Sequence, residues 1–113
     1  MSTEHIKELV KAFGDAAARL MEAGLDGIEL AASHGMLMAQ FLNPLTNRRD
    51  DVYGGTEENR YRFVAELIHA VRASMGEDKV LGIRMSAEEI EPDGIDAAGW
   101  LRICSRLNAE SGL

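Results

Sequence analysis

Two short apolar segments, each set between amphipathic helical patterns, constrain the fold of this chain more than any other feature. The first is D-G-I-E-L-A-A over residues 26–32, and the second is K-V-L-G-I-R-M-S over residues 79–86. Both segments are too short for a helix and suit buried strands. The resulting order of helix, strand, helix, strand and helix predicts an α/β fold, with a parallel sheet and crossover helices.

The first two helices have clear signals in the sequence. Apolar residues recur at helical spacing from a start at Thr3 and Glu4 up to Gly24. A second helix is expected after Thr56, whose hydroxyl can cap free N–H groups, and it runs to about Met75 before a left-handed stop at Gly76.

A third helix is predicted after the polar turn E-E-I-E-P-D-G. Asp96 is its expected cap and Gly112 its expected end. The apolar residues assigned to this helix are Trp100, Leu101, Ile103, Cys104 and Leu107. Cys104 is the only cysteine, so no internal disulfide can form, and we interpret it as a buried helix residue.

Two strands cannot complete a parallel sheet of this kind, so the expected architecture is part of a (βα)8 barrel. The segment M-E-A-G-L-D at 21–26 leads into the first strand, and N-A-E-S-G-L at 108–113 closely resembles it. A complete barrel takes roughly 250 residues. We therefore interpret residues 1–113 as one partial barrel domain, truncated at both ends and taken from near the middle.

Composition excludes several classes of protein. Hydrophobic residues make up 46% and charged residues 27% of the 113, which is an ordinary globular balance. The net charge is −7 and the basic residues are scattered, which argues against a nucleic-acid partner. No apolar run approaches the roughly 20 residues needed to cross a bilayer, and no signal-peptide pattern is present, so a soluble, cytoplasmic protein without a membrane partner is expected.

Strand alternation suggests where chemistry would occur. In a barrel, side chains point alternately to the helices and to the interior, and catalytic groups gather at the carboxyl ends of the strands. The predicted helix-facing residues are Ile28, Leu30, Leu81, Ile83 and Met85, and the predicted inward residues are Gly27, Glu29, Ala31, Gly82, Arg84 and Ser86. Arg84 then lies near the catalytic rim, and His34 follows the first strand at the mouth. Residues 33–55 form a long connection, a length that is usually functional.

The segment from 26 to 63 resembles the signature of the old yellow enzyme family. Its most specific parts are N-P-L-T-N-R-R-D at 43–50 and Y-G-G-x-x-x-N-R-x-R-F at 53–63. Relatives in that family include 2,4-dienoyl-CoA reductases and trimethylamine dehydrogenases. The resemblance implies an FMN-dependent barrel in which NADH, NADPH or an amine reduces the flavin, which then passes electrons to an activated alkene or another small acceptor.

The resemblance also implies roles for four residues. Arg84 matches a strand-end arginine beside the flavin N1 and C2 carbonyl, where a cation stabilises the reduced flavin. His34 matches the second member of a pair that hydrogen-bonds the substrate oxygen, whereas Ala31 stands at the first member and can donate nothing. Met36 stands where many relatives carry a proton-donating tyrosine, and a thioether cannot act as a general acid. Another group or water would supply the proton, or the reaction is an amine or electron-transfer oxidation.

Structural alternatives accompany these roles. Arg84 can instead form an internal ion pair with Glu29, His34 can be a satisfied loop histidine, and Ala31 and Met36 can simply shape a pocket. The charged and turn residues of the second half of the signature suit a hydrogen-bonded loop scaffold more than catalysis. His5 and His69 are expected at the surface, and Met21, Met38, Met75 and Met85 are expected to fill the core.

Three functional hypotheses follow. The leading one is part of an FMN oxidoreductase whose FMN phosphate contacts lie in other strands, so that these 113 residues alone are inactive. The second is a noncatalytic partial barrel that covers its strand edges by pairing with another copy, as a homo-oligomer. The third is a barrel enzyme with another cofactor, against which the signature from Tyr53 to Phe63 argues.

Overall fold

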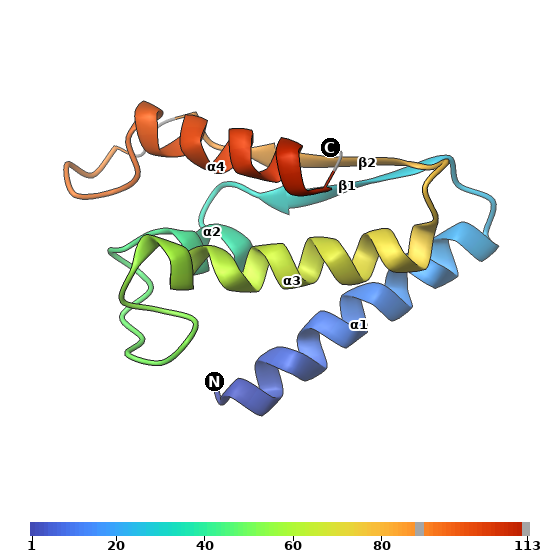
Figure 1. Ribbon diagram of the computed structural model, residues 1–113, viewed down its shortest axis with the longest axis horizontal. Helices are drawn as coiled ribbons and strands as arrows, with labels where there is room; N and C mark the ends of the chain where they lie inside the picture. The colour runs from blue at the N-terminus through green and yellow to red at the C-terminus, as the bar shows by residue number, and fades with distance from the viewer. Residues whose placement is uncertain (88–89, 112–113) are drawn as a thin grey trace.

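Four helices and a two-stranded parallel sheet make up the computed structural model, which describes residues 1–87 and 90–111 (Figure 1). The elements in chain order are α1 (Thr3–Glu22), β1 (Gly27–Ala32), α2 (Leu37–Leu42), α3 (Glu57–Met75), β2 (Val80–Met85) and α4 (Ala97–Ser111). Apart from α2, these are the predicted elements, with ends within two residues of those expected.

The helix starts follow from side-chain caps. The Ser2 hydroxyl accepts a hydrogen bond from the His5 N–H at 3.1 Å, and the Thr56 hydroxyl accepts one from the Asn59 N–H at 3.1 Å. The Asp96 carboxylate accepts from the Gly99 N–H at 2.7 Å, as predicted. Each acceptor satisfies an N–H group that has no partner within the helix. Gly76 ends α3 as predicted and has a positive φ of 89°, although its ψ of 167° lies outside the left-handed helical region.

The sheet confirms the predicted alternation. β1 and β2 pair in parallel, with Glu29 opposite Gly82 and Ala31 opposite Arg84. Leu30 is buried in one core with side chains of α1, α3 and α4. The opposite face, which carries Glu29, Ala31 and Arg84, is exposed.

The connection between β1 and α3 was wrongly predicted to lack a helix, because α2 lies within it. Leu37, Met38, Phe41 and Leu42 are spaced as one side of a helical turn, and the last three are buried. Asn43 then adopts extended backbone (ψ 123°) before Pro44, which the proline ring requires. A six-residue helix is too short to be stable by itself, so α2 depends on its packing against the rest of the molecule.

Cys104 of α4 was wrongly predicted to be buried. Trp100, Ile103 and Leu107 form the buried stripe, whereas Leu101 is 68% exposed and Cys104 is also exposed. Leu101 follows Trp100, and Cys104 follows Ile103. One residue along a helix is a turn of about 100°, so both side chains point away from the core. The predicted helix end at Gly112 and the first two residues of the polar turn, 88–89, lie outside the described residues.

The surface and core predictions for the remaining residues are confirmed. His5 and His69 are exposed, Met38 and Met75 are buried, and Met21 and Met85 pack against the core while partly buried. Within residues 1–87 and 90–111, no helix has the length and apolar character needed to span a bilayer.

Candidate functional site

The carboxyl ends of β1 and β2 lie at the same end of the molecule, next to α2 (Figure 1). β1 ends at Ala32 and leads directly into residues 33–36, and β2 ends at Met85. Parallel strands bring their carboxyl ends to one edge, so the inner face of the sheet and the loop after β1 meet there. This edge, called the mouth below, carries all four residues that the sequence singled out. They are Ala31, His34, Met36 and Arg84.

Arg84 forms an ion pair on the open face of the sheet. Its Nε donates to Glu29 Oε1 at 2.7 Å, and the two side chains are 65% and 57% exposed. The hydrogen bond to the carboxylate, together with its negative charge, raises the pKa of the Arg84 guanidinium above its ordinary value. The predicted partner is thus present, although the arginine is exposed rather than buried. Among the described residues the terminal nitrogens of Arg84 have no partner, so one edge of the guanidinium remains able to donate.

His34 lies in a left-handed turn at the mouth. Its φ is 55°, the only positive value for a residue other than glycine in the described part of the chain, and Gly35 follows with a φ of 68°. Such backbone is strained for a residue with a Cβ and is often found at functional sites. Two bonds hold the turn, from the Met36 N–H to the Ser33 carbonyl at 3.1 Å and from Gln40 Nε2 to the Gly35 carbonyl at 2.7 Å.

The His34 ring is also held from one side. Its Nδ1 lies 2.8 Å from the hydroxyl oxygen of Ser33, a residue only 3% exposed. His34 itself is exposed, and no other hydrogen bond of its ring is present among the described residues. The histidine is therefore oriented while one nitrogen, Nε2, remains available.

Ala31 and Met36 bring no proton to this edge. Ala31 is exposed and lies opposite Arg84 in the strand register, and Met36 is 52% exposed at the start of α2. Both side chains can only shape a pocket. Any donor or acceptor from β1, β2 and residues 33–36 must therefore come from other side chains, such as His34, Arg84 and the Glu29 carboxylate beside Arg84.

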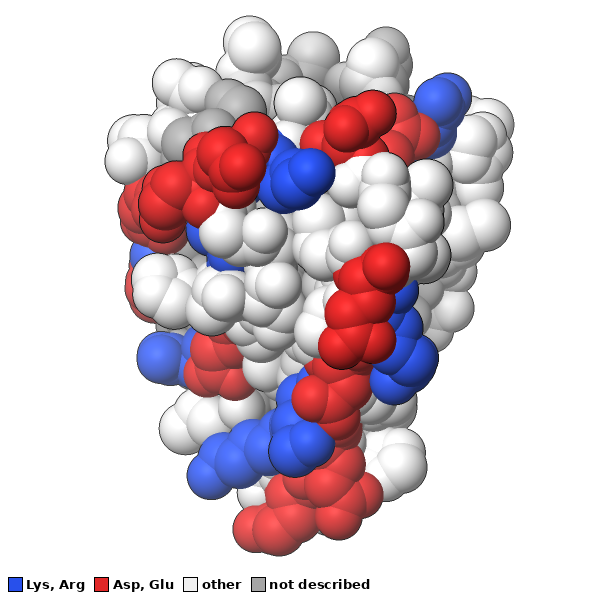
Figure 2. Space-filling model, turned by 90° about the vertical axis from the view of Figure 1, so that its right-hand side faces the viewer, with Lys and Arg blue, Asp and Glu red and all other residues white. Residues whose placement is uncertain are grey.

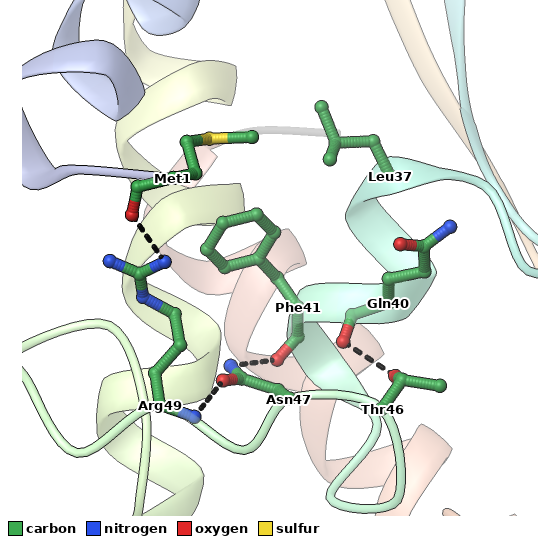
Figure 3. A pocket seen from close by; sticks show the side chains of 7 residues that line it. All are labelled: Met1, Leu37, Gln40, Phe41, Thr46, Asn47 and Arg49. Atoms are coloured by element: carbon green, nitrogen blue, oxygen red, sulfur yellow. Dashed lines mark hydrogen bonds between the residues drawn. The ribbon is translucent and has the colours of Figure 1, made fainter.

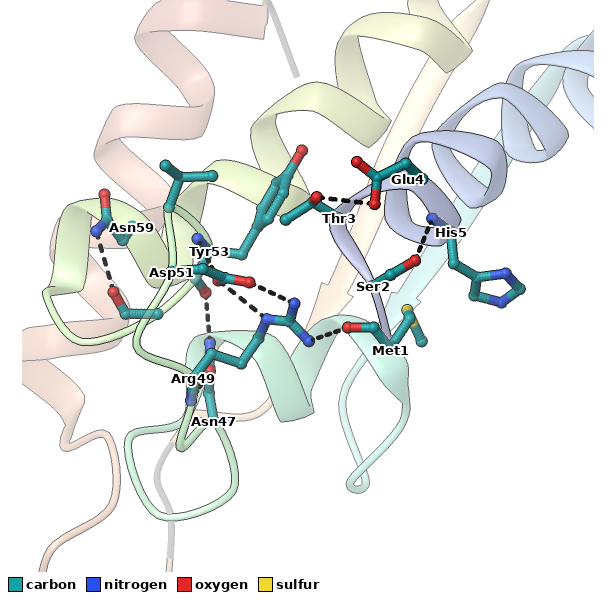
Figure 4. A network of polar contacts seen from close by, with 12 residues as sticks. Met1, Ser2, Thr3, Glu4, His5, Asn47, Arg49, Asp51, Tyr53 and Asn59 are labelled. Carbon is teal, nitrogen blue, oxygen red and sulfur yellow. Dashed lines mark hydrogen bonds and ion pairs between the residues drawn. The ribbon is translucent and has the colours of Figure 1, made fainter.

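The second half of the signature forms a hydrogen-bonded loop, as predicted (Figure 4). Asn47, which is 9% exposed, donates from Nδ2 to the carbonyls of Phe41 at 2.7 Å and Tyr53 at 2.8 Å, and its Oδ1 accepts from the Arg49 N–H at 3.2 Å. The Arg49 guanidinium pairs with the Asp51 carboxylate, with 3.1 Å between Nε and Oδ1. This pairing lowers the pKa of Asp51.

Two further arginines and a tyrosine join α2 and the loop to α3. Arg60 donates to the Leu42 carbonyl at 3.0 Å and Arg62 to the Val52 carbonyl at 2.8 Å. The Tyr53 hydroxyl donates to Glu66 at 2.9 Å, and burial raises the pKa of Tyr53 to about 12. These polar groups are occupied by the chain itself, which confirms the scaffold interpretation.

A small cavity of about 180 Å³ lies between α2, the loop that joins α2 to α3, and the amino-terminal residue (Figure 3). Its lining residues are Met1, Leu37, Gln40, Phe41, Thr46, Asn47 and Arg49. Arg49 already bonds the Met1 carbonyl at 2.8 Å, and Thr46 bonds the Gln40 carbonyl at 2.7 Å. The polar groups around this cavity therefore serve the loop.

Acidic and basic side chains are interspersed on the end of the molecule opposite the candidate site (Figure 2). They form no continuous basic surface on that face. The described residues also contain no group of three or more His, Cys, Asp or Glu side chains placed to hold a metal ion.

Two contributors to the candidate site were missed by the sequence reasoning. Ser33 fixes the His34 ring, and Gln40 of α2 holds the turn. Ser33 follows β1 directly, and a polar side chain at a strand end was an available signal. Gln40 could be found only once α2 was known to bring it back to Gly35.

Comparisons with known proteins support a common origin over almost the whole chain. Residues 1–108 match the family model described as the NADH:flavin oxidoreductase / NADH oxidase family. An NADPH dehydrogenase of Bacillus velezensis is 52% identical over 98 residues, which cover 87% of this chain and 28% of that protein. An N,N-dimethylglycine/sarcosine dehydrogenase of Chromohalobacter salexigens is 43% identical over 106 residues, covering 94% and 15% respectively.

A solved structure agrees with these sequence matches. A complex of 2-naphthoyl-CoA reductase with 2-naphthoyl-CoA superposes with a TM-score of 0.93 at 33% identity, covering 97% of this chain and 17% of that one. The arrangement of helices and strands is therefore that of part of a TIM-barrel reductase, as predicted. The chain spans less than a third of the length of each of these relatives.

Proposed function

Because the chain belongs to the NADH:flavin oxidoreductase / NADH oxidase family, we propose that it supplies one part of the active-site edge of an FMN-dependent oxidoreductase. In this proposal, FMN when bound would supply hydride transfer from NADH or NADPH to a small-molecule acceptor such as an activated alkene or enoyl compound. A cytoplasmic location belongs to the same proposal.

The observation that carries the proposal is the exposed guanidinium of Arg84. Its Nε is oriented by Glu29, while the terminal nitrogens have no partner among the described residues. A fixed cation with free N–H groups fits the N1 and C2 carbonyl edge of a flavin, where negative charge collects on reduction. Arg84 would hold that edge, and Glu29 would keep the guanidinium in place.

At the mouth, His34 would bind an acceptor oxygen of the substrate. It would act as a single donor, because Ala31, which stands at the position of the pair's first member, has no polar side-chain atom. Met36 cannot protonate a substrate carbon, so the proton for alkene reduction would come from another group or from water.

The lack of a proton donor at Ala31 and Met36 favours a second candidate, the oxidation of a small amine. A dehydrogenase named for N,N-dimethylglycine and sarcosine is among the similar proteins. Anaerobic mixing with NADPH and an enone, or with a secondary amine, distinguishes the two reactions. An amine oxidase loses flavin absorbance with the amine alone, whereas an alkene reductase loses it with NADPH and recovers it with the enone.

Replacement of Arg84 tests the flavin role. In the protein expressed from its complete reading frame, we expect Arg84→Ala to weaken FMN binding at least tenfold or to lower the flavin reduction potential, because the cation beside the reduced flavin is lost. Arg84→Lys should recover only part of the effect, since an ammonium lacks the planar fork. Arg19→Ala, which alters an exposed arginine of α1, is the matched control. An unchanged FMN affinity and potential in Arg84→Ala would remove Arg84 from the site.

A noncatalytic partial barrel that self-associates is the alternative from another class. Size-exclusion chromatography with absorbance detection separates the two hypotheses. A yellow protein with flavin absorbance at 1:1 stoichiometry supports the oxidoreductase, and a colourless dimer of the complete protein supports the assembly module.

A further inference from the structure

We infer that Ser33 is a positioning residue that holds His34 in the neutral tautomer with its proton on Nε2, and that His34 therefore contacts its ligand as a hydrogen-bond donor to an acceptor oxygen. The tautomer follows from the contacts of Ser33 alone. Its meaning for ligand contact rests on the proposed function.

The burial of Ser33 decides the direction of its hydrogen bond. The Ser33 hydroxyl is in a residue only 3% exposed, and His34 Nδ1, at 2.8 Å, is its side-chain partner among the described residues. If Nδ1 carried a proton, the Ser33 oxygen would accept a hydrogen bond from the Nδ1–H group. The O–H of Ser33 would then be buried without an acceptor, which costs free energy. If the hydroxyl donates to Nδ1, its proton is satisfied.

The tautomer of a neutral imidazole is set by the hydrogen bond of the other nitrogen. With Nδ1 accepting from Ser33, the ring proton is on Nε2, which lies on the opposite side of the ring from the buried hydroxyl. His34 is exposed, and its Nε2 has no hydrogen-bond partner among the described residues, so Nε2–H is available to a ligand.

The backbone supports this orientation. His34 and Gly35 both adopt left-handed backbone, with φ values of 55° and 68°, and Gln40 bonds the Gly35 carbonyl at 2.7 Å. The Met36 N–H bonds the Ser33 carbonyl at 3.1 Å. The strained turn is thus closed on both sides of the histidine, which keeps the ring over the Ser33 hydroxyl.

The consequence for ligand recognition is that His34 acts as a hydrogen-bond donor. An Nε2–H pairs with a carbonyl or carboxylate oxygen, but it offers no lone pair to the N–H of a neutral amine. The terminal nitrogens of Arg84 on the same edge are also donors. His34 and Arg84 therefore both suit an acceptor oxygen of a ligand, and the Glu29 carboxylate beside Arg84 is an acceptor on the same face.

Nitrogen NMR tests the tautomer directly in the 113-residue chain. Long-range ¹H–¹⁵N spectra of ¹⁵N-histidine protein at about pH 9, at which imidazole is neutral, report the protonation of each ring nitrogen. The chain has three histidines, so each ring system can be assigned by substitution. His69, exposed on α3, is the internal reference for an unconstrained ring, whereas His5 Nδ1 lies 3.5 Å from Glu8.

We expect His34 to show Nδ1 at the fully unprotonated shift and Nε2 at the fully protonated shift, more extreme than His69. Ser33→Ala should move both His34 shifts to the values of His69, and Ser33→Thr, which keeps the hydroxyl, should restore them. Unchanged His5 and His69 signals show that each variant is folded. A protonated Nδ1 in the unmodified protein, or no change of His34 in folded Ser33→Ala, overturns the inference.

The contact between His34 and the ligand is tested separately, by enzyme kinetics in the flavin-loaded complete protein. Ser33→Ala should raise KM for an enone at least threefold with a smaller change in kcat, and Ser33→Thr should reverse it. A protein that binds no flavin contradicts the proposed function but leaves the tautomer result intact. The expected tautomer together with an unchanged KM contradicts the ligand contact alone.

Discussion

Asn47 illustrates how a recognisable sequence motif serves the scaffold. All three of its side-chain hydrogen bonds go to backbone groups, those of Phe41 in α2, Tyr53 and Arg49. The amide thereby connects a short helix to two points of an irregular loop. By contrast, the residues proposed for chemistry, His34 and Arg84, are exposed and keep polar atoms without a hydrogen-bond partner among the described residues.

Removal of this amide should destabilise the loop strongly. We expect Asn47→Ala to lower the free energy of unfolding by about 2–3 kcal/mol, because two carbonyls and one N–H lose their partners at a buried position. Urea denaturation followed by circular dichroism measures the change. Asn108→Ala, at an exposed position of α4, should change it by less than about 0.5 kcal/mol. Equal effects of the two substitutions would contradict the proposed role of Asn47.

At the scale of elements, α3 and α4 are joined by an ion-pair network outside the core. Arg106 donates to both oxygens of Glu58, with Nη2 2.9 Å from Oε1, and to Glu110 at 2.8 Å, while its guanidinium lies 4.0 Å above the Tyr61 ring. The Tyr61 hydroxyl donates to Glu110 at 3.0 Å, and burial is the main cause that raises the pKa of Tyr61. Charge and aromatic contacts thus fix α4 relative to α3.

This network predicts a pH dependence of stability. The hydrogen bonds from Arg106 and Arg102 lower the pKa values of Glu58 and Glu57 respectively. A lowered pKa in the folded state gives stability that is fully present above the unfolded value, about 4.3, and is lost as the pH falls through the folded value. The free energy of unfolding should therefore decrease from about pH 5 towards pH 3.

Arg106→Gln should flatten that decrease, because it removes the main cause of the lowered Glu58 pKa. Urea denaturation at a series of pH values measures the slope. Arg19→Gln, at an exposed position of α1, should keep the original slope. A slope in Arg106→Gln as steep as in the unmodified protein would assign the acid sensitivity to other carboxylates, such as Asp51.

At the scale of the whole molecule, the core connects the candidate site to the helical layer. Phe63 of α3 is fully buried, and its ring centre lies 4.2 Å from that of Phe41 in α2. The same core includes Leu30 of β1 and Leu107 of α4. The short helix next to the mouth is therefore held by packing that extends across the molecule.

Phe63→Ala should accordingly be among the most destabilising single substitutions. We expect a loss of about 3–5 kcal/mol in the free energy of unfolding, from lost burial and the cavity that remains. Leu101→Ala, at a side chain 68% exposed, should cost less than about 0.5 kcal/mol. Thermal and urea unfolding measure both, and a cost below about 1 kcal/mol for Phe63→Ala would show that α2 packs independently of this ring.

Local signals in the sequence determined much of this protein. The order of strands and long helices follows from hydrophobic period, and the helix ends follow from Thr56, Asp96 and Gly76, whose effects act within a few residues. Strand alternation placed Glu29 and Arg84 on the same face correctly. The family followed from the motif at 43–63, because its charged and turn residues encode a particular loop.

Tertiary structure decided the features that depend on distant partners. α2 is too short to be stable alone and exists because Phe41 meets Phe63. Burial in α4 depends on which side faces the core, so the exposure of Cys104 could not be settled by its apolar character. The hydrogen bond between Ser33 and His34 needs a left-handed turn that only the closed loop holds in place. Local chemistry set the elements, and packing set which polar atoms remain available at the site.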